Sequence, residues 1–348
     1  EVLPMPDRVR LNDISSRAWE HPADRAALNT LRALPGFDEV VRKVAGFLGE
    51  RGVRQLFLAN AVRVGGAQRP GLDGIYTEVL ETLDAPTRWD LYVSQTPIAN
   101  AFAVGFDRPF IVLNSGMLGL LDREGRRNVI AHEIGHIMSG HATYTTLALL
   151  ILMIGLRNLP MLTGLALLPF QLAILEWYRK AEFSADRAGL LGSQDVRASM
   201  EVYLKLAGGG GGDDTIDLDT FMAQAAEYEG EPGVVDKIWQ MLNTALKTHP
   251  FATVRAAELQ RWTASGEYER ILRGEYPRRG QEPPPLGNDY AQAGDYYAQQ
   301  AREVVASIRT SFDRARQAFD QGFRGPGTGG NAGGGTGSGA GTGGSGTA

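Results

Sequence analysis

Cysteine is absent from the 348 residues of the chain. Its absence excludes disulfide bridges, thiolate metal ligands and cysteine nucleophiles, so any bound metal must be held by nitrogen and oxygen atoms. An excess of positive charge is also lacking, because 35 Lys and Arg residues stand against 40 Asp and Glu residues, for a net charge of −5. The basic residues are scattered and form no stripe, which argues against nucleic acid as a partner.

Long uninterrupted apolar runs are lacking too. The most apolar stretch, residues 145–175, contains Arg157, and Pro160 and Pro169 divide it into pieces shorter than the about 20 residues of a transmembrane helix. Two interpretations stay open for this insertion: a hairpin buried against the domain or a partner subunit, or a segment in peripheral contact with a membrane. No transmembrane helix precedes it, so the expected location is either the cytoplasm or a membrane surface.

The first part of the chain, residues 1–84, is expected to be a helical segment that packs on the domain that follows it. Apolar residues at three- and four-residue intervals predict helices over residues 23–34 and 37–48. Three β-rich runs follow at residues 89–94, 99–104 and 109–114, and they predict a small antiparallel sheet. That second domain is expected to cover residues 85–275.

Further along the chain, more helices are predicted over residues 218–229, 235–247 and 252–264. A flexible glycine run at 208–212 lacks the lysine and hydroxyl residue of a phosphate-binding loop. A proline-rich linker is expected at residues 276–291, and a helix at 292–322 that packs back on the domain. Residues 323–348 are almost entirely Gly, Thr, Ser and Ala, which have nothing to bury, so a disordered tail is expected.

One helix is expected to carry the chemistry. Asp122 is a suitable N-cap for a helix that runs to about residue 142. Within it, residues 132–136 read H-E-I-G-H, an H-E-x-x-H motif. Its two histidines, His132 and His136, stand one turn apart on a helix, so both imidazoles can reach one ion, and Glu133 lies beside them.

An H-E-x-x-H motif on a helix is typical of a catalytic zinc site. Such a site needs a third protein ligand, commonly a carboxylate. Glu182 is the candidate, on a second helix predicted from about residue 171 to 191. Asp186 follows it by four residues and would point the same way, where it could accept the outer N–H of a ligating histidine. Two like charges one turn apart mildly destabilise an isolated helix, so this pair of carboxylates indicates that a cation lies nearby.

These residues closely resemble the M48 metallopeptidases, the family of CAAX prenyl proteases and bacterial membrane-quality-control proteases. The resemblance covers about residues 89–255. It is carried by H-E-x-x-H, by E-x-x-x-D at 182–186, by N-A-F-A at 100–103, by I-V-L-N-S-G-M-L at 111–118, and by T-H-P at 248–250 with an arginine six residues after its histidine.

The resemblance implies a mainly helical α+β domain of the zincin-like (gluzincin) type, with its active-site helix packed under the small sheet. It also implies one zinc ion per chain, held by His132, His136 and Glu182, with Glu133 as general base and Asp186 orienting a ligand. The implied activity is hydrolysis of internal peptide bonds in polypeptides, whether unfolded or membrane-associated.

Other residues are expected to surround the cleft. His249 and Arg255 would lie near it and could donate to the developing oxyanion or reach the metal. The strand containing Ile111, Leu113 and Asn114 is expected to form the sheet edge on which an extended substrate lies. Asn100 is a candidate substrate contact, although a turn residue at the start of a strand is an alternative.

Two histidines are left outside the site. His141 is expected to turn away from the metal face of the helix, in a capping or surface role. His21 is expected to be structural or solvated, without an identified partner. Two rival functions stay open: a chaperone-like binder of unfolded proteins that retains zinc, and a membrane-associated scaffold whose proteolysis is incidental. The sequence does not indicate an oligomeric state.

Overall fold

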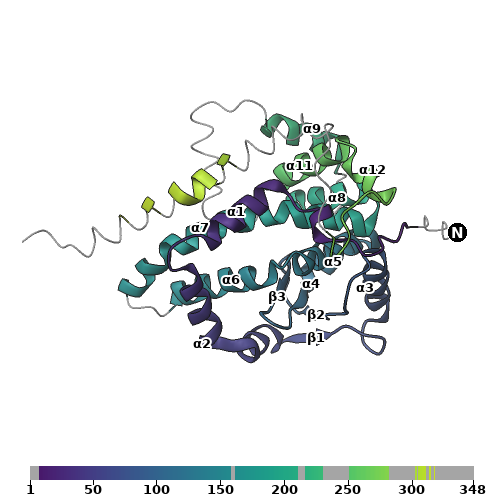
Figure 1. The fold of residues 1–348 in the computed structure, drawn as a ribbon. Coiled ribbons are helices and arrows are strands. Elements are labelled where there is room, and N and C mark those ends of the chain that lie inside the picture. The colour runs from purple at the N-terminus through teal and green to yellow at the C-terminus, as the bar shows by residue number, and fades with distance from the viewer. Residues whose placement is uncertain are drawn as a thin grey trace, which may run out of the picture.

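A computed structural model describes residues 8–157, 161–210, 216–229, 251–281 and parts of 302–317 (Figure 1). Its described part is mainly helical and contains one four-stranded sheet. In chain order, the elements are η1 Ser16–Ala18, α1 Pro22–Arg32, α2 Phe37–Leu58, β1 Ala61–Arg63, α3 Pro70–Thr82, β2 Asp90–Ser94, β3 Ala101–Val104, β4 Phe110–Asn114, α4 Ser115–Leu120, α5 Arg123–Met138, α6 Ala142–Arg157, α7 Met161–Ser193, α8 Val196–Gly208, α9 Leu218–Glu229, α11 Ala252–Ala264 and α12 Glu267–Leu272.

The sheet is mixed, so the prediction of an antiparallel sheet is wrong. Its strand order is β1-β2-β4-β3, with β2 and β4 parallel and the outer pairs antiparallel. The three strands predicted from sequence are present, and β1 adds a fourth. The expectation that β4 is the sheet edge is also wrong, because β4 lies between β2 and β3, and Ile111, Leu113 and Asn114 are buried. The edge near the active-site helix is β3.

The sheet is covered by helices on both faces, which explains why all five β4 residues are buried. Ile111 and Leu113 face the core that α5 and α3 share, while Phe110 and Val112 face a second core with Leu147 of α6. A strand buried on both faces has no polar alternation, so its sequence gives no sign of which strand is outermost.

Helix α5 runs through the centre of the domain, with the sheet on one side and α7, α8 and α11 on the other (Figure 1). Asp122 caps its N-terminus, since its side chain accepts a hydrogen bond from the backbone N–H of Gly125 at 2.8 Å, as predicted. The helix ends at Met138, about one turn before the predicted end. Because every residue from position 127 to 137 is buried, α5 is a core helix rather than an amphipathic surface helix.

Two glycines let α5 and α7 approach each other closely. A Cβ at Gly135 would overlap the Cβ of Ala188, and a Cβ at Gly192 would overlap the Cβ of Ala131. In the first pair the glycine is on α5 and the alanine on α7, and in the second pair the glycine is on α7 and the alanine on α5. Close contact between α5 and α7 therefore depends on the absence of side chains at these positions.

We expect Gly135→Ala to destabilise the protein by about 1–3 kcal/mol, because the added methyl group forces the two helices apart in a packed core. The shift should also weaken metal binding, since the metal-ligand candidates are divided between these helices. Urea denaturation and zinc titration measure the two effects. Gly74→Ala in α3 is the matched control: a Cβ there meets nothing within 4 Å, so that change should be neutral or stabilise by about 0.5–1 kcal/mol. Equal stability of both variants would contradict this account.

Helix α1 lies along α7, and a buried histidine at its N-terminus also links it to α11 (Figure 1). His21 is completely buried and caps α1, because its Nδ1 accepts a hydrogen bond from the N–H of Ala23 at 3.1 Å. Its Nε2 lies 3.0 Å from Glu258 of α11. Burial, with the nearby charge of Arg187, lowers the pKa of His21 to about 4, so it is neutral at pH 7. His21 is therefore a structural residue with a defined partner, not a solvated one.

Helix α7 starts at Met161, ten residues earlier than predicted, and continues through Pro169. The prediction that Pro169 divides the apolar segment is therefore wrong. A proline removes one backbone hydrogen bond, and the rest of this 33-residue helix continues past it. At the described ends of the segment, Leu147, Leu150 and Ile174 are buried in the domain core. Among the described helices, none has the length and apolar character required to cross a membrane.

Several predictions fall outside the described residues. These are the helix at 235–247, His249, most of the linker at 276–291 and the tail at 323–348. The helices predicted at 218–229 and 252–264 are confirmed. For the helix predicted at 292–322, the residues described between 302 and 317 are helical, and Ile308 is buried in the same core as α1 and α6.

Candidate metal centre

Three side chains converge where α5 meets α7. The Nε2 atoms of His132 and His136 lie 3.1 Å apart. Glu182 faces both, with Oε1 3.2 Å from Nε2 of His136 and Oε2 3.7 Å from Nε2 of His132. All three side chains are at least nine-tenths buried. The structure thus brings together the three residues that the sequence analysis proposed as a ligand set.

The spacing of these atoms fits a zinc ion. Ligands about 2.0–2.2 Å from a tetrahedral zinc ion are about 3.3–3.6 Å from one another. The observed separations of 3.1, 3.2 and 3.7 Å, the last two measured to different oxygens of the Glu182 carboxylate, lie close to that range. The donor set of two imidazoles and one carboxylate is also one that catalytic zinc sites use, with a fourth position left for water.

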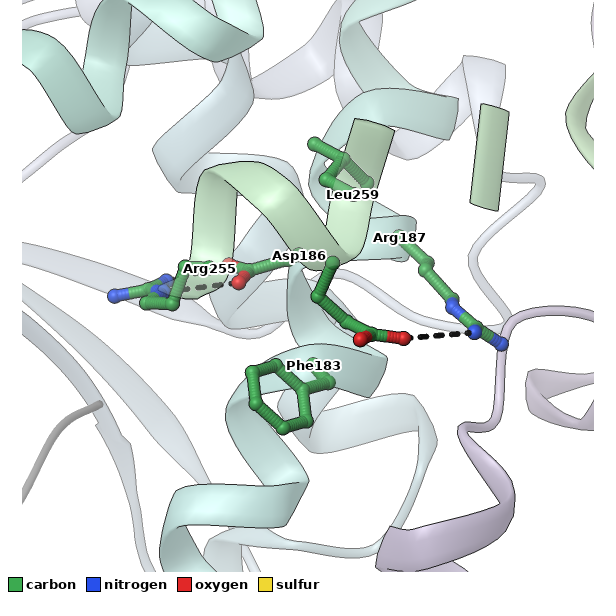
Figure 2. Close-up of a pocket in the computed structure, with 6 residues that line it drawn as sticks. Phe183, Asp186, Arg187, Arg255 and Leu259 are labelled. Atoms are coloured by element: carbon green, nitrogen blue, oxygen red, sulfur yellow. Dashed lines mark hydrogen bonds and ion pairs between the residues drawn. The ribbon is translucent and has the colours of Figure 1, made fainter. Parts of the chain in front are cut away.

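Asp186 of α7 and Arg255 of α11 contact each other (Figure 2), and each also contacts a ligand candidate. Asp186 lies 3.0 Å from Nδ1 of His132, so it can accept the outer N–H of that imidazole, as proposed from sequence. Arg255 donates two hydrogen bonds to the Asp186 carboxylate, at 2.9 and 2.5 Å, and its Nη1 lies 3.2 Å from Glu182. The guanidinium therefore contacts both carboxylates of the E-x-x-x-D pair and allows them to be buried one turn apart.

The two histidines have opposite pKa shifts. Burial dominates at His136 and lowers its pKa to about 4, which keeps the imidazole neutral and able to bind a metal. Burial also acts on His132, but the hydrogen bond with Asp186 and the negative charge of Glu182 outweigh it and raise its pKa. For Asp186, the charge of Arg255 and the hydrogen bonds from Arg255 and His132 overcome the effect of burial and lower its pKa.

Glu133 lies between the two histidines on α5 and is buried, with 4% of its surface exposed. Across from it, Tyr178 stacks on His136 with the ring centroids 6.4 Å apart and the rings 3° from parallel. The sequence analysis missed Tyr178, although it precedes Glu182 by four residues and so shares its face of α7. That spacing could have identified it.

His141 is not at the surface, so the predicted surface role is wrong, although the structure also leaves it out of the group of ligand candidates. It is 2% exposed, and its Nδ1 lies 3.1 Å from Nδ1 of His136. Helix α5 ends in a Schellman turn: Gly140 has a φ of +74°, its N–H donates to Ile137, and the N–H of His141 donates to the carbonyl of His136. This turn bends the chain back, so the helical rotation used in the prediction no longer applies at His141.

The two described residues discussed next, Asn100 and Arg255, were expected to lie near the substrate, and their surroundings differ. Asn100 is half-buried at the start of β3, where its side chain accepts a hydrogen bond from the N–H of Ala101 and its carbonyl accepts one from Asn114. The backbone bond extends the pairing of β3 with β4, and a substrate contact at Asn100 stays a prediction. Arg255 lies beside the ligand candidates but is engaged with their carboxylates, and its oxyanion role stays a prediction.

The comparisons with known proteins agree with this geometry. The model of Peptidase family M48 matches residues 67–263, more than half of the chain. The plastoglobule-localized metallopeptidase 48 of Arabidopsis thaliana chloroplasts is 32% identical over 268 residues, which cover 75% of this chain and 76% of the relative. A protease HtpX homolog of Helicobacter acinonychis (strain Sheeba) is 26% identical over 182 residues, covering 45% of this chain and 59% of that protein. No solved structure matches the chain. The chain belongs to peptidase family M48 and is a metallopeptidase.

Proposed function

We propose that the protein is a zinc-dependent endopeptidase with one zinc ion per chain, held by His132, His136 and Glu182. The observation that carries the proposal is the convergence of these three buried side chains at spacings that suit a tetrahedral ion. When bound, zinc would lower the pKa of a coordinated water molecule to about 7 and polarise the carbonyl group under attack.

The protein's own residues supply the proton transfers and the orientation. The Glu133 carboxylate takes a proton from the attacking water and delivers it to the departing amine. Asp186 accepts the Nδ1–H of His132, which fixes the tautomer that leaves Nε2 free for the metal. Arg255 offsets part of the negative charge of Glu182 and Asp186.

We place the substrate along β3 rather than β4. β3 is the outermost strand on its side of the sheet and packs near α5, which carries the metal-ligand histidines. An extended peptide could pair with it through backbone hydrogen bonds, which give affinity with little dependence on side chains. This mode favours unfolded polypeptides as substrates. Peripheral contact of the apolar segment 145–175 with a membrane stays part of the proposal, in line with the localisation in the name of the Arabidopsis relative.

Metal removal tests the proposal. Purified protein should contain one zinc ion per chain by elemental analysis and should cleave casein into discrete fragments. Removal of the ion with 1,10-phenanthroline should stop cleavage, and an equimolar addition of zinc should restore it. Protein that carries the ion and binds casein, yet leaves it intact, would support the chaperone-like function instead. Protein without metal affinity would contradict the site itself.

A further inference from the structure

His136 has a partner behind it that comes from outside the H-E-x-x-H motif. Its Nε2 faces Glu182, and its Nδ1 lies 3.1 Å from Nδ1 of His141. On the far side, Nε2 of His141 lies 3.1 Å from the Asp24 carboxylate. All three side chains are at most 4% exposed. A continuous buried path therefore leads from a proposed zinc ligand to a carboxylate on α1.

Asp24 is a fixed end point for this path. Its Oδ1 accepts a hydrogen bond from Nε1 of Trp177 at 3.0 Å, and its Oδ2 accepts one from the Ser184 hydroxyl at 2.6 Å. Both oxygens of Asp24 therefore accept hydrogen bonds, as those of an ionised carboxylate do. Asp24 precedes residue 67, where the match to the family model begins.

The direction of each hydrogen bond follows from the chemistry of the end points. A carboxylate only accepts, so His141 must donate from Nε2, and its neutral form then leaves Nδ1 as an acceptor. Nδ1 of His136 must therefore carry a hydrogen, and Nε2 keeps its lone pair. That is the tautomer in which His136 can bind a metal through the atom that faces Glu182.

We propose that Asp24 and His141 are positioning residues that fix the tautomer and orientation of His136, so that the N-terminal helix α1 is part of the metal centre. The inference rests on the proposed zinc site. It gives the two imidazole ligands separate supports: Asp186 contacts His132 directly, whereas Asp24 acts on His136 through His141. Partners of this kind contribute about 10- to 100-fold to metal affinity.

Asp24→Asn is the decisive variant. The indole N–H of Trp177 can only donate, so the asparagine oxygen stays at that position and its NH₂ group faces His141. His141 must then accept at Nε2 and carry its hydrogen on Nδ1, opposite Nδ1 of His136. His136 is forced into the tautomer with hydrogen on Nε2. Zinc affinity should fall about 10- to 100-fold, and the visible spectrum of the cobalt(II)-substituted protein should change.

Glu258→Gln is the matched control. Glu258 is also a buried carboxylate 3.0 Å from a buried histidine, and His21 likewise belongs to the α1 region, but neither residue is one of the three metal-ligand candidates. Both changes should lower the thermal stability of the metal-free protein. Only Asp24→Asn should weaken zinc binding, whereas Glu258→Gln should stay within about threefold of the unaltered protein.

Variants at His141 keep the test decisive if Asp24→Asn does not fold. In His141→Gln the amide oxygen can accept from His136 and the NH₂ group can donate to Asp24, so zinc affinity should be nearly retained. His141→Leu has no acceptor and should lose about 10- to 100-fold. Unchanged zinc affinity in Asp24→Asn or in His141→Leu would overturn the positioning role. Failure of the unaltered protein to bind zinc would instead remove the proposed site.

Discussion

Glu133→Gln should reduce casein cleavage by about 10²–10⁴-fold, the usual contribution of a positioned general base. Glutamine has the same shape but does not accept a proton from the attacking water. Because Glu133 is not among the three metal-ligand candidates, the variant should still bind one zinc ion and should bind casein normally. Initial cleavage rates, measured beside zinc content, test this, and the loss should appear in kcat rather than KM.

A carboxylate elsewhere on α5 provides the comparison for that variant. Glu124 lies in the first turn of the same helix and pairs with Arg8 and Arg127, far along the helix from the histidines. Glu124→Gln should cost some stability and leave zinc content and kcat nearly unchanged. If Glu133→Gln cleaves casein at the original rate with zinc bound, the assignment of the base is wrong.

Glu182→Gln should largely abolish zinc binding. The change removes the one anionic ligand candidate, and an amide oxygen is a much weaker partner for zinc than a carboxylate. The effect should exceed the about 10- to 100-fold loss expected for a residue that only orients a ligand, such as Asp186→Asn. Competition with a zinc-binding dye measures both affinities, and casein cleavage should disappear in parallel.

The same helix offers a control for this change. Glu176 lies on α7 six residues before Glu182 and pairs with Arg179. Glu176→Gln should retain the affinity for zinc. Zinc retained by Glu182→Gln at its original affinity would show that the third ligand lies elsewhere.

Features encoded within one helix were predicted well from the sequence. The N-cap at Asp122, the one-turn spacing of His132 and His136, and the four-residue spacing of Glu182 and Asp186 are local, and the structure reproduces each of them. A helix determines which of its own residues share a face, so spacing is sufficient. The family resemblance supplied what spacing could not, namely that α5 and α7 meet.

Features that depend on how distant segments meet were predicted poorly. β3 and β4 are both short and apolar, and only their pairing makes β3 the edge and β4 the centre. His141 was misplaced because one αL residue, Gly140, redirects the chain. Asp24 was not recognised at all, since its partners Trp177 and Ser184 lie more than 150 residues away in sequence. No pattern in the sequence around Asp24 indicates that Trp177 and Ser184 lie close to it.

The glycine–alanine contacts between α5 and α7 also determine how the two helices can move. Because the two pairs are reversed, with one glycine on each helix, sliding either helix by one residue would replace a glycine with a side chain at one of the contacts. The two contacts therefore fix the position of α5 along α7. The distance from the histidine nitrogens to the glutamate oxygens is thus set by steric exclusion in the protein, so the polypeptide itself defines the size of ion that fits between them.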